Sequence, residues 1–74
     1  MFKTHLYHPH PDFQDTIVGS VEYSDSISKK RYKELHQHVL REWITGKDYL
    51  IDGLVSRLMK NGEVTAIKIA DELL

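Results

Sequence analysis

The chain has 74 residues, of which 41% are hydrophobic and 28% are charged, and its formal net charge at neutral pH is −1. These proportions are typical of one soluble domain, whereas a disordered chain would contain fewer apolar residues. The near-zero net charge excludes a generally basic nucleic-acid coat. Since there is no cysteine, disulfides, thiolate metal sites and thiol nucleophiles are excluded as well.

Hydropathy gives no indication of a membrane protein. The N-terminal residues contain no apolar stretch of the kind found in signal peptides. The longest apolar run is residues 49–51, whereas a helix that crosses a bilayer needs about 20 apolar residues. We therefore expect a small cytoplasmic protein that does not bind membranes.

The first two predicted elements are strands that pair as a β-hairpin. Residues 2–7 alternate between apolar and polar side chains, and residues 16–23 are rich in β-branched side chains and alternate again. Pro9 and Pro11 keep the segment between them extended. Gly19, inside the second strand, indicates a bulge or the close approach of another backbone.

A long amphipathic helix is predicted over residues 28–45. Serines at 24–28 offer N-cap oxygens, and Gly46 is a suitable residue to end the helix. Its apolar stripe has a period of 3.6 residues and consists of Tyr32, Leu35, His36, Val39, Leu40 and Trp43. We expect Trp43 to anchor the core and His36 to be a hydrogen-bonded core histidine.

A second helix is predicted over residues 49–60, with apolar side chains around half of its circumference. Gly53 lies inside it, at a cost of about 1 kcal/mol relative to alanine, and would allow another backbone to come close. The alternative is a short strand at 49–51 followed by a turn at Asp52-Gly53.

A third helix is predicted over residues 66–74, after a break at Asn61-Gly62 and with Thr65 as its N-cap. The predicted fold class is therefore α+β. One small domain, residues 1–74, contains the N-terminal hairpin followed by three helices.

The last third of the chain, LIDGLVSRLMKNGEVTAIKIADELL at residues 50–74, resembles the first two helices of a helix-turn-helix or winged-helix domain. The resemblance rests on the apolar helix, the break NGEVT and the spacing of Ile69, Ala70 and Leu73. The recognition helix of such domains has no counterpart here. The resemblance thus implies a DNA-binding scaffold and assigns no base-contacting residue. A tight helical hairpin in a small core is the alternative interpretation.

Basic residues cluster at the start of the predicted first helix, where the helix dipole disfavours cations. A phosphate or an acidic protein surface would compensate for that placement; a solvated helix start is the alternative. Together with the aromatic and imidazole side chains of the hairpin, they form the candidate partner-binding set: Lys29, Lys30, Arg31, Lys33, Tyr7, His8 and His10.

No motif for catalysis, cofactor binding or metal binding is recognisable. His5, His8 and His10 are close enough in sequence to share a transition metal, but exposed loop histidines are the simpler interpretation. The carboxylates are scattered, and no phosphate-binding loop, nucleophile elbow or zinc-protease motif is present. We expect neither an enzyme nor a cofactor.

By elimination, the sequence favours a small regulatory or adaptor protein that binds and modulates a macromolecular partner, first of all another protein. Its size is typical of the accessory inhibitors of phages and mobile elements. The alternative is a DNA-binding regulator, either monomeric or dimeric, with a helix-turn-helix-like C-terminal half. A further alternative is self-assembly through the broad apolar face of the helix at 49–60.

Overall fold

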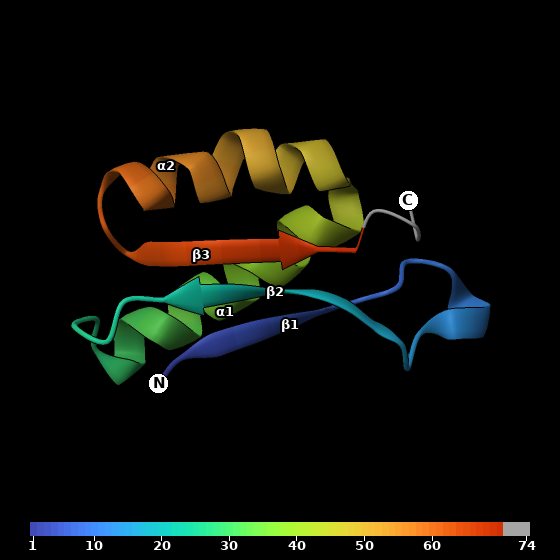
Figure 1. The fold of residues 1–74 in the computed structure, drawn as a ribbon, viewed down its shortest axis with the longest axis horizontal. Helices are drawn as coiled ribbons and strands as arrows, with labels where there is room; N and C mark the ends of the chain where they lie inside the picture. The colour runs from blue at the N-terminus through green and yellow to red at the C-terminus, as the bar shows by residue number, and fades with distance from the viewer. Residues whose placement is uncertain (71–74) are drawn as a thin grey trace.

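The computed structural model describes residues 1–70, in which two helical segments cover one face of a three-stranded antiparallel sheet (Figure 1). The strands are β1 (Lys3–Tyr7), β2 (Ile17–Tyr23) and β3 (Val64–Ile69), in the spatial order β1-β2-β3. The helices are α1 (Lys29–Thr45), the π-helix η2 (Tyr49–Val55), its continuation α2 (Ser56–Lys60), and a short 3₁₀ turn, η1 (Pro11–Phe13). The predicted α+β class is confirmed.

The predicted hairpin is also confirmed, because β1 pairs antiparallel with β2. Its register shifts near the loop, where the partner of Leu6 is Gly19 but the partner of Tyr7 is Ile17. Val18 is therefore the extra residue of a β-bulge. The bulge turns its side chain into the core, where it is buried.

The predicted third helix is wrong over the residues that the structure describes. Val64–Ile69 form β3, which pairs antiparallel with β2, and residues 71–74 of the predicted helix lie outside the described residues. Gly62, with φ +81°, supplies the left-handed turn residue that leads into the strand. Four of the six residues of VTAIKI are β-branched, which favours a strand once a free edge of β2 is at hand.

Gly19 is the position where β3 comes close to β2. A Cβ atom built on Gly19 would overlap the backbone carbonyl oxygen of Lys68. Gly19 therefore combines the two features predicted for it, since it lies next to the bulge at Val18 and allows another backbone to approach.

Helix α1 begins and ends as the sequence predicts. The Ser28 Oγ atom accepts a hydrogen bond from the Arg31 amide at 3.0 Å, and Gly46 follows the last helical residue. Two side chains of α1 then bind the free side of β1: the Tyr32 hydroxyl donates to the Lys3 carbonyl at 3.0 Å, and the Trp43 indole donates to the Tyr7 carbonyl at 2.7 Å.

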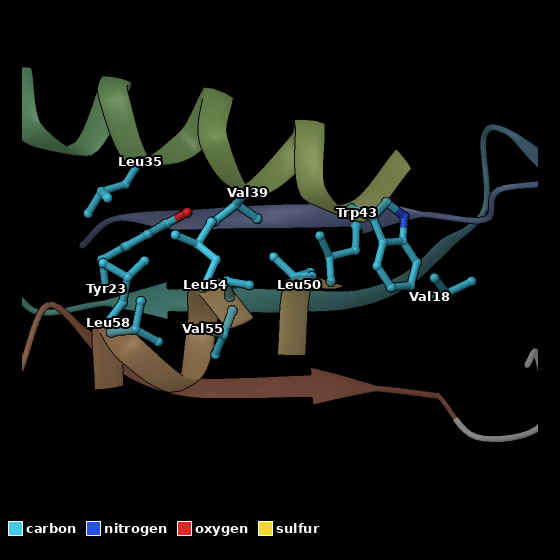
Figure 2. Close-up of a cluster of buried hydrophobic side chains, with 12 residues drawn as sticks. Val18, Tyr23, Leu35, Val39, Trp43, Leu50, Leu54, Val55 and Leu58 are labelled. Carbon is cyan, nitrogen blue, oxygen red and sulfur yellow. The ribbon is translucent and has the colours of Figure 1, made fainter. Parts of the chain in front are cut away.

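The helix predicted at 49–60 is confirmed as η2 followed by α2, so the alternative of a strand and turn at 49–53 is wrong. Its apolar face packs against both α1 and β3, as the width of that face requires. Figure 2 shows the resulting core between the helices and the sheet. Its buried residues are Leu6, Val18, Val21, Tyr23, Leu35, Val39, Trp43, Leu50, Leu54, Val55, Leu58 and Val64.

Candidate functional site

An apolar groove of about 410 Å³ lies where the last turns of α1 meet the hairpin loop. The loop side of the groove is lined by Tyr7, His8, Pro9, Pro11 and Gln14, and the helix side by Leu40, Trp43 and Ile44. Its volume is at the lower end of the range found for ligand sites, about 300–1,000 Å³. The groove is large enough to take one or two apolar side chains of a partner.

Exposed apolar side chains line this groove or contact residues that line it. Ile44 is 83% exposed and Phe13 is 54% exposed, although both are large and hydrophobic. Tyr7 and Ile17, paired across the hairpin next to the loop, are exposed as well. Single exposed apolar residues are ordinary, whereas a contiguous cluster around a hollow is typical of a binding surface.

The loop that forms one wall of the groove is held by its own histidines. The Nδ1 atom of His8 accepts the His10 amide at 3.0 Å, and the Nδ1 atom of His10 accepts the Asp12 amide at 3.1 Å. Both rings lie against Phe13, with centroid separations of 5.2 and 5.7 Å. The two imidazoles therefore build the loop, in addition to any contact they make with a partner.

The same hydrogen bonds bear on charge and metal binding in the loop. His10 Nδ1 lies 3.7 Å from an Asp12 carboxylate oxygen, but a nitrogen that accepts an amide proton carries none of its own, so the pair is not an ion pair in this geometry. Among residues 1–70, no cluster of three or more histidine, aspartate or glutamate side chains has the arrangement of a metal site.

The predicted basic cluster lies at the opposite end of α1. Lys30 and Ile44 are separated by about 21 Å along the helix, at 1.5 Å per residue. Figure 1 shows the start of α1 beside the turn that connects α2 to β3, far from the hairpin loop. The structure therefore separates the seven candidate residues into two groups. Tyr7 and His8 line the groove and His10 lies in the same loop without lining it, whereas Lys29, Lys30, Arg31 and Lys33 lie at the other end.

Arg31 differs from its basic neighbours because it is bound to an acidic residue. Its guanidinium makes a bidentate contact with Glu63, at 2.6 Å from Nε and 3.0 Å from Nη2, and lies 3.6 Å from a Glu34 oxygen. This contact lowers the pKa of Glu63 and raises that of Arg31. Arg31 thus ties the start of α1 to the turn before β3, while the neighbouring lysines stay exposed.

A buried polar network lies between the sheet and α1. Thr4 Oγ1 is 2.7 Å from the Tyr23 hydroxyl and 2.8 Å from His36 Nδ1, so the prediction of a hydrogen-bonded core histidine is confirmed. Burial, opposed by the hydrogen bond from Thr4, raises the pKa of Tyr23 to about 12. The network pairs the buried hydroxyl groups of Thr4 and Tyr23 and links the sheet to α1 through His36.

Sequence reasoning missed the helix half of the groove. Trp43 was correctly predicted as a core anchor, and it is buried, but its indole edge also reaches the loop. Ile44 lies off the apolar stripe. A large apolar residue on the polar side of an amphipathic helix is the signal by which this surface could have been found.

None of the helices in the described part of the chain is long and apolar enough to cross a membrane. Comparison with protein-family models, with curated proteins and with solved structures gave no match.

Proposed function

We propose that this protein is a small non-enzymatic regulator or adaptor that binds another protein through the apolar groove at the hairpin loop. The observation that carries the proposal is the groove of about 410 Å³ between Trp43, Ile44 and the Pro-rich loop. Exposed aromatic and aliphatic residues around a hollow are the usual anchors of protein interfaces. Occlusion of the partner's surface would be the mode of action.

A rigid wall favours this role for the groove. Trp43 is 7% exposed and its indole is fixed by the hydrogen bond to the Tyr7 carbonyl. The proline rings and the histidine–amide hydrogen bonds limit the conformations of the loop. A partner side chain would therefore enter a site that is already formed, which lowers the entropic cost of binding.

The test is a tagged pull-down from a native cell extract, with and without nuclease, using wild type and Ile44→Glu. Because Ile44 is almost fully exposed, the substitution places a charge at the groove without disturbing the core. We expect one stoichiometric protein band that survives nuclease and is lost with Ile44→Glu. Gln37→Glu, on the exposed side of α1, is the matched control and should keep the band.

A DNA-binding regulator is the second candidate, and the exposed lysines at the start of α1 are the observation that favours it. Arg57 and Lys60, in the last turn of α2, lie toward the same end of the molecule (Figure 1). Nucleic acid that co-purifies, is lost when Lys29, Lys30 and Lys33 are replaced by glutamate, and is retained by Ile44→Glu would favour this candidate over the first. Its affinity should fall steeply with salt.

A further inference from the structure

The outer side of β3 has no partner among the described residues. The Ala70 amide donates to the Val18 carbonyl at 2.8 Å. The backbone N–H and C=O groups of the even-numbered residues of this strand therefore point toward β2. Because antiparallel strands alternate, the amides and carbonyls of Ile67 and Ile69 point away from the sheet. No described group is hydrogen-bonded to them. An edge of this kind is a template for another strand.

A second unexplained feature lies on the neighbouring helical segment. Gly53 is exposed, and a Cβ atom built on it would meet nothing within 4 Å. It borders a shallow hollow of about 380 Å³, whose other lining residues are Asp48, Tyr49 and Asp52. A glycine inside a helix is destabilising relative to alanine, and no contact within the described chain requires it. Close approach of another helix would require it.

The charges of the same segment are arranged in two halves. Asp48 and Asp52 lie in its first half, and Arg57 and Lys60 lie in its last turn. All four are exposed, and none forms an ion pair within residues 1–70. When two such segments lie antiparallel, the acidic half of each faces the basic half of the other.

Gly53 on the helical segment and Ile67 on β3 lie at about the same level along the two elements. A strand rises about 3.3 Å per residue and a helix about 1.5 Å, so Val64 to Ile67 and Lys60 to Gly53 both cover roughly 10 Å. Since α2 runs antiparallel to β3 and is joined to it by a short turn (Figure 1), Gly53 lies near the level of Ile67. One axis can therefore pass by both residues.

We propose that two copies of this chain associate about a two-fold axis that passes by Ile67 and Gly53. The two β3 strands pair antiparallel with Ile67 opposite Ile67 of the second copy, which makes one continuous six-stranded sheet. The η2–α2 segments of the two copies then cross at Gly53 with their opposite charges facing each other. The closed pair leaves no free edge at β3.

The proposed register also gives Lys68 an acidic partner and explains why Ala66 is small. With Ile67 at the axis, Lys68 of the second copy lies opposite Ala66 on the open face of the sheet. Glu22 is the partner of Ala66 on β2 and already holds Lys3 at 3.3 Å. The small Ala66 side chain leaves Lys68 of the second copy room to reach Glu22. If the axis passed by Lys68 instead of Ile67, the two Lys68 side chains would lie opposite each other, which is repulsive.

A second copy fits these features better than an unrelated extended peptide. A peptide would satisfy the edge of β3, but it would leave Gly53 and the two charged halves of the helix without a function. Only a partner with the same helix at the same height complements both surfaces. The groove at the hairpin loop lies outside this interface, so the dimer does not depend on the proposed function.

The first test is sedimentation equilibrium of the wild-type chain from micromolar to millimolar concentration. We expect a concentration-dependent rise from the 8.7 kDa mass of one chain to twice that value. In the dimer, the amides of Ile67 and Ile69 should exchange with solvent at least ten times more slowly than in the dilute monomer. A mass that stays at one chain up to millimolar concentration would overturn the proposal.

Gly53→Lys tests the helix crossing. The new side chain has room in the monomer but would put bulk and a positive charge at the axis, so we expect at least a tenfold weaker dimer with unchanged circular dichroism. Gln37→Lys, on the exposed side of α1, adds the same charge elsewhere and should leave the dimer intact. Equal dimerisation of the Gly53→Lys and Gln37→Lys variants would contradict the proposed arrangement.

Charge reversal supplies a test that does not depend on Gly53. Asp48→Arg alone and Arg57→Asp alone should each weaken the dimer several-fold. With the axis at Gly53, Asp48 of one copy faces Arg57 of the other, so each single change places like charges across the axis. The double variant exchanges the two signs and should regain most of the affinity. If the double variant binds more weakly than both single variants, the antiparallel arrangement is wrong.

Discussion

The two edges of the sheet are finished in different ways. On the β1 edge, the carbonyls of Lys3 and Tyr7 accept hydrogen bonds from Tyr32 and Trp43, which lie three turns apart on α1. On the β3 edge, no side chain of the described residues plays that part, although η2–α2 lies beside the strand. Helices on one face of a small sheet can thus protect one edge and leave the backbone groups of the other edge free.

The two edges also differ in how their backbone groups are satisfied. The β1 edge is closed by contacts between residues 29 and 36 positions apart in sequence, which hold the hairpin against α1 and form one wall of the groove. The β3 edge leaves backbone groups accessible to solvent, where they can be used by another strand. Substitutions at Trp43, Gly19 and Tyr32 and an alkaline titration of Tyr23 test this difference between the two edges.

Trp43→Ala should have the largest effect, because it removes a buried ring and the hydrogen bond that fixes the β1 edge. Loss of such a ring from a core costs about 3–5 kcal/mol, which is a large part of the stability of a domain this small. Trp43→Phe keeps an aromatic ring and loses the indole N–H, so a smaller loss of about 1–2 kcal/mol is expected. Urea unfolding followed by circular dichroism measures both; a Trp43→Phe variant as stable as the wild type would contradict a role for the hydrogen bond.

Gly19→Ala tests the attachment of β3. The added methyl group would overlap the Lys68 carbonyl, so β3 must move away from β2, at an expected cost of about 3 kcal/mol. Amide exchange should become faster in β3 before it does in β1. The matched control is Gly53→Ala, the same change at a position with free space, which should stabilise the monomer by up to about 1 kcal/mol. A tolerated Gly19→Ala would mean that the two strands are not in close contact.

Alkaline titration tests the link between β1 and the central strand. The pKa of Tyr23 is raised to about 12 in the folded protein, whereas an exposed tyrosine has a pKa near 10. Between these two pH values the Tyr23 hydroxyl loses its proton in the unfolded chain but keeps it in the folded one. The contribution of Tyr23 to the free energy of unfolding is therefore fully present below pH 10 and falls by roughly 2–3 kcal/mol as the pH rises to 12. Tyr23→Phe should remove this contribution to the pH dependence; a slope that persists unchanged would rule out Tyr23 as its source.

Tyr32→Phe should have the smallest effect. It removes the hydroxyl that donates to the Lys3 carbonyl, while the ring keeps its stacking on Phe2 at a centroid separation of 4.7 Å. Because water can replace the hydroxyl at this exposed site, we expect a loss of only about 0.5–1 kcal/mol. Amide exchange at the start of β1 provides the local measurement, and a loss as large as that of Trp43→Ala would show that the two ends of this edge are not independent.

Much of the fold could be predicted because its elements depend on residues near one another in sequence. The hairpin, α1 with its Ser28 cap and the helix at 49–60 were all predicted close to their observed bounds. Residues 64–69 were not, because the spacing of Ala66, Ile69 and Ala70 suits a helix as well as VTAIKI suits a strand. The deciding factor was the free edge of β2, more than 40 residues away, which local periodicity does not register.

Some features of the candidate site likewise depend on local sequence, and others depend on packing. Local spacing in the sequence is enough to indicate the loop residues Tyr7, His8 and His10, the amphipathic stripe with Trp43 and the basic start of α1. Packing of the elements was needed to show that Ile44 joins the loop in one groove, that Arg31 is bound to Glu63, and that the basic cluster lies at the far end of α1. Arg31 and Glu63 are 32 positions apart in the sequence, and Trp43 is 36 positions from the Tyr7 carbonyl that it binds. These groups meet only after the sheet and helices have packed.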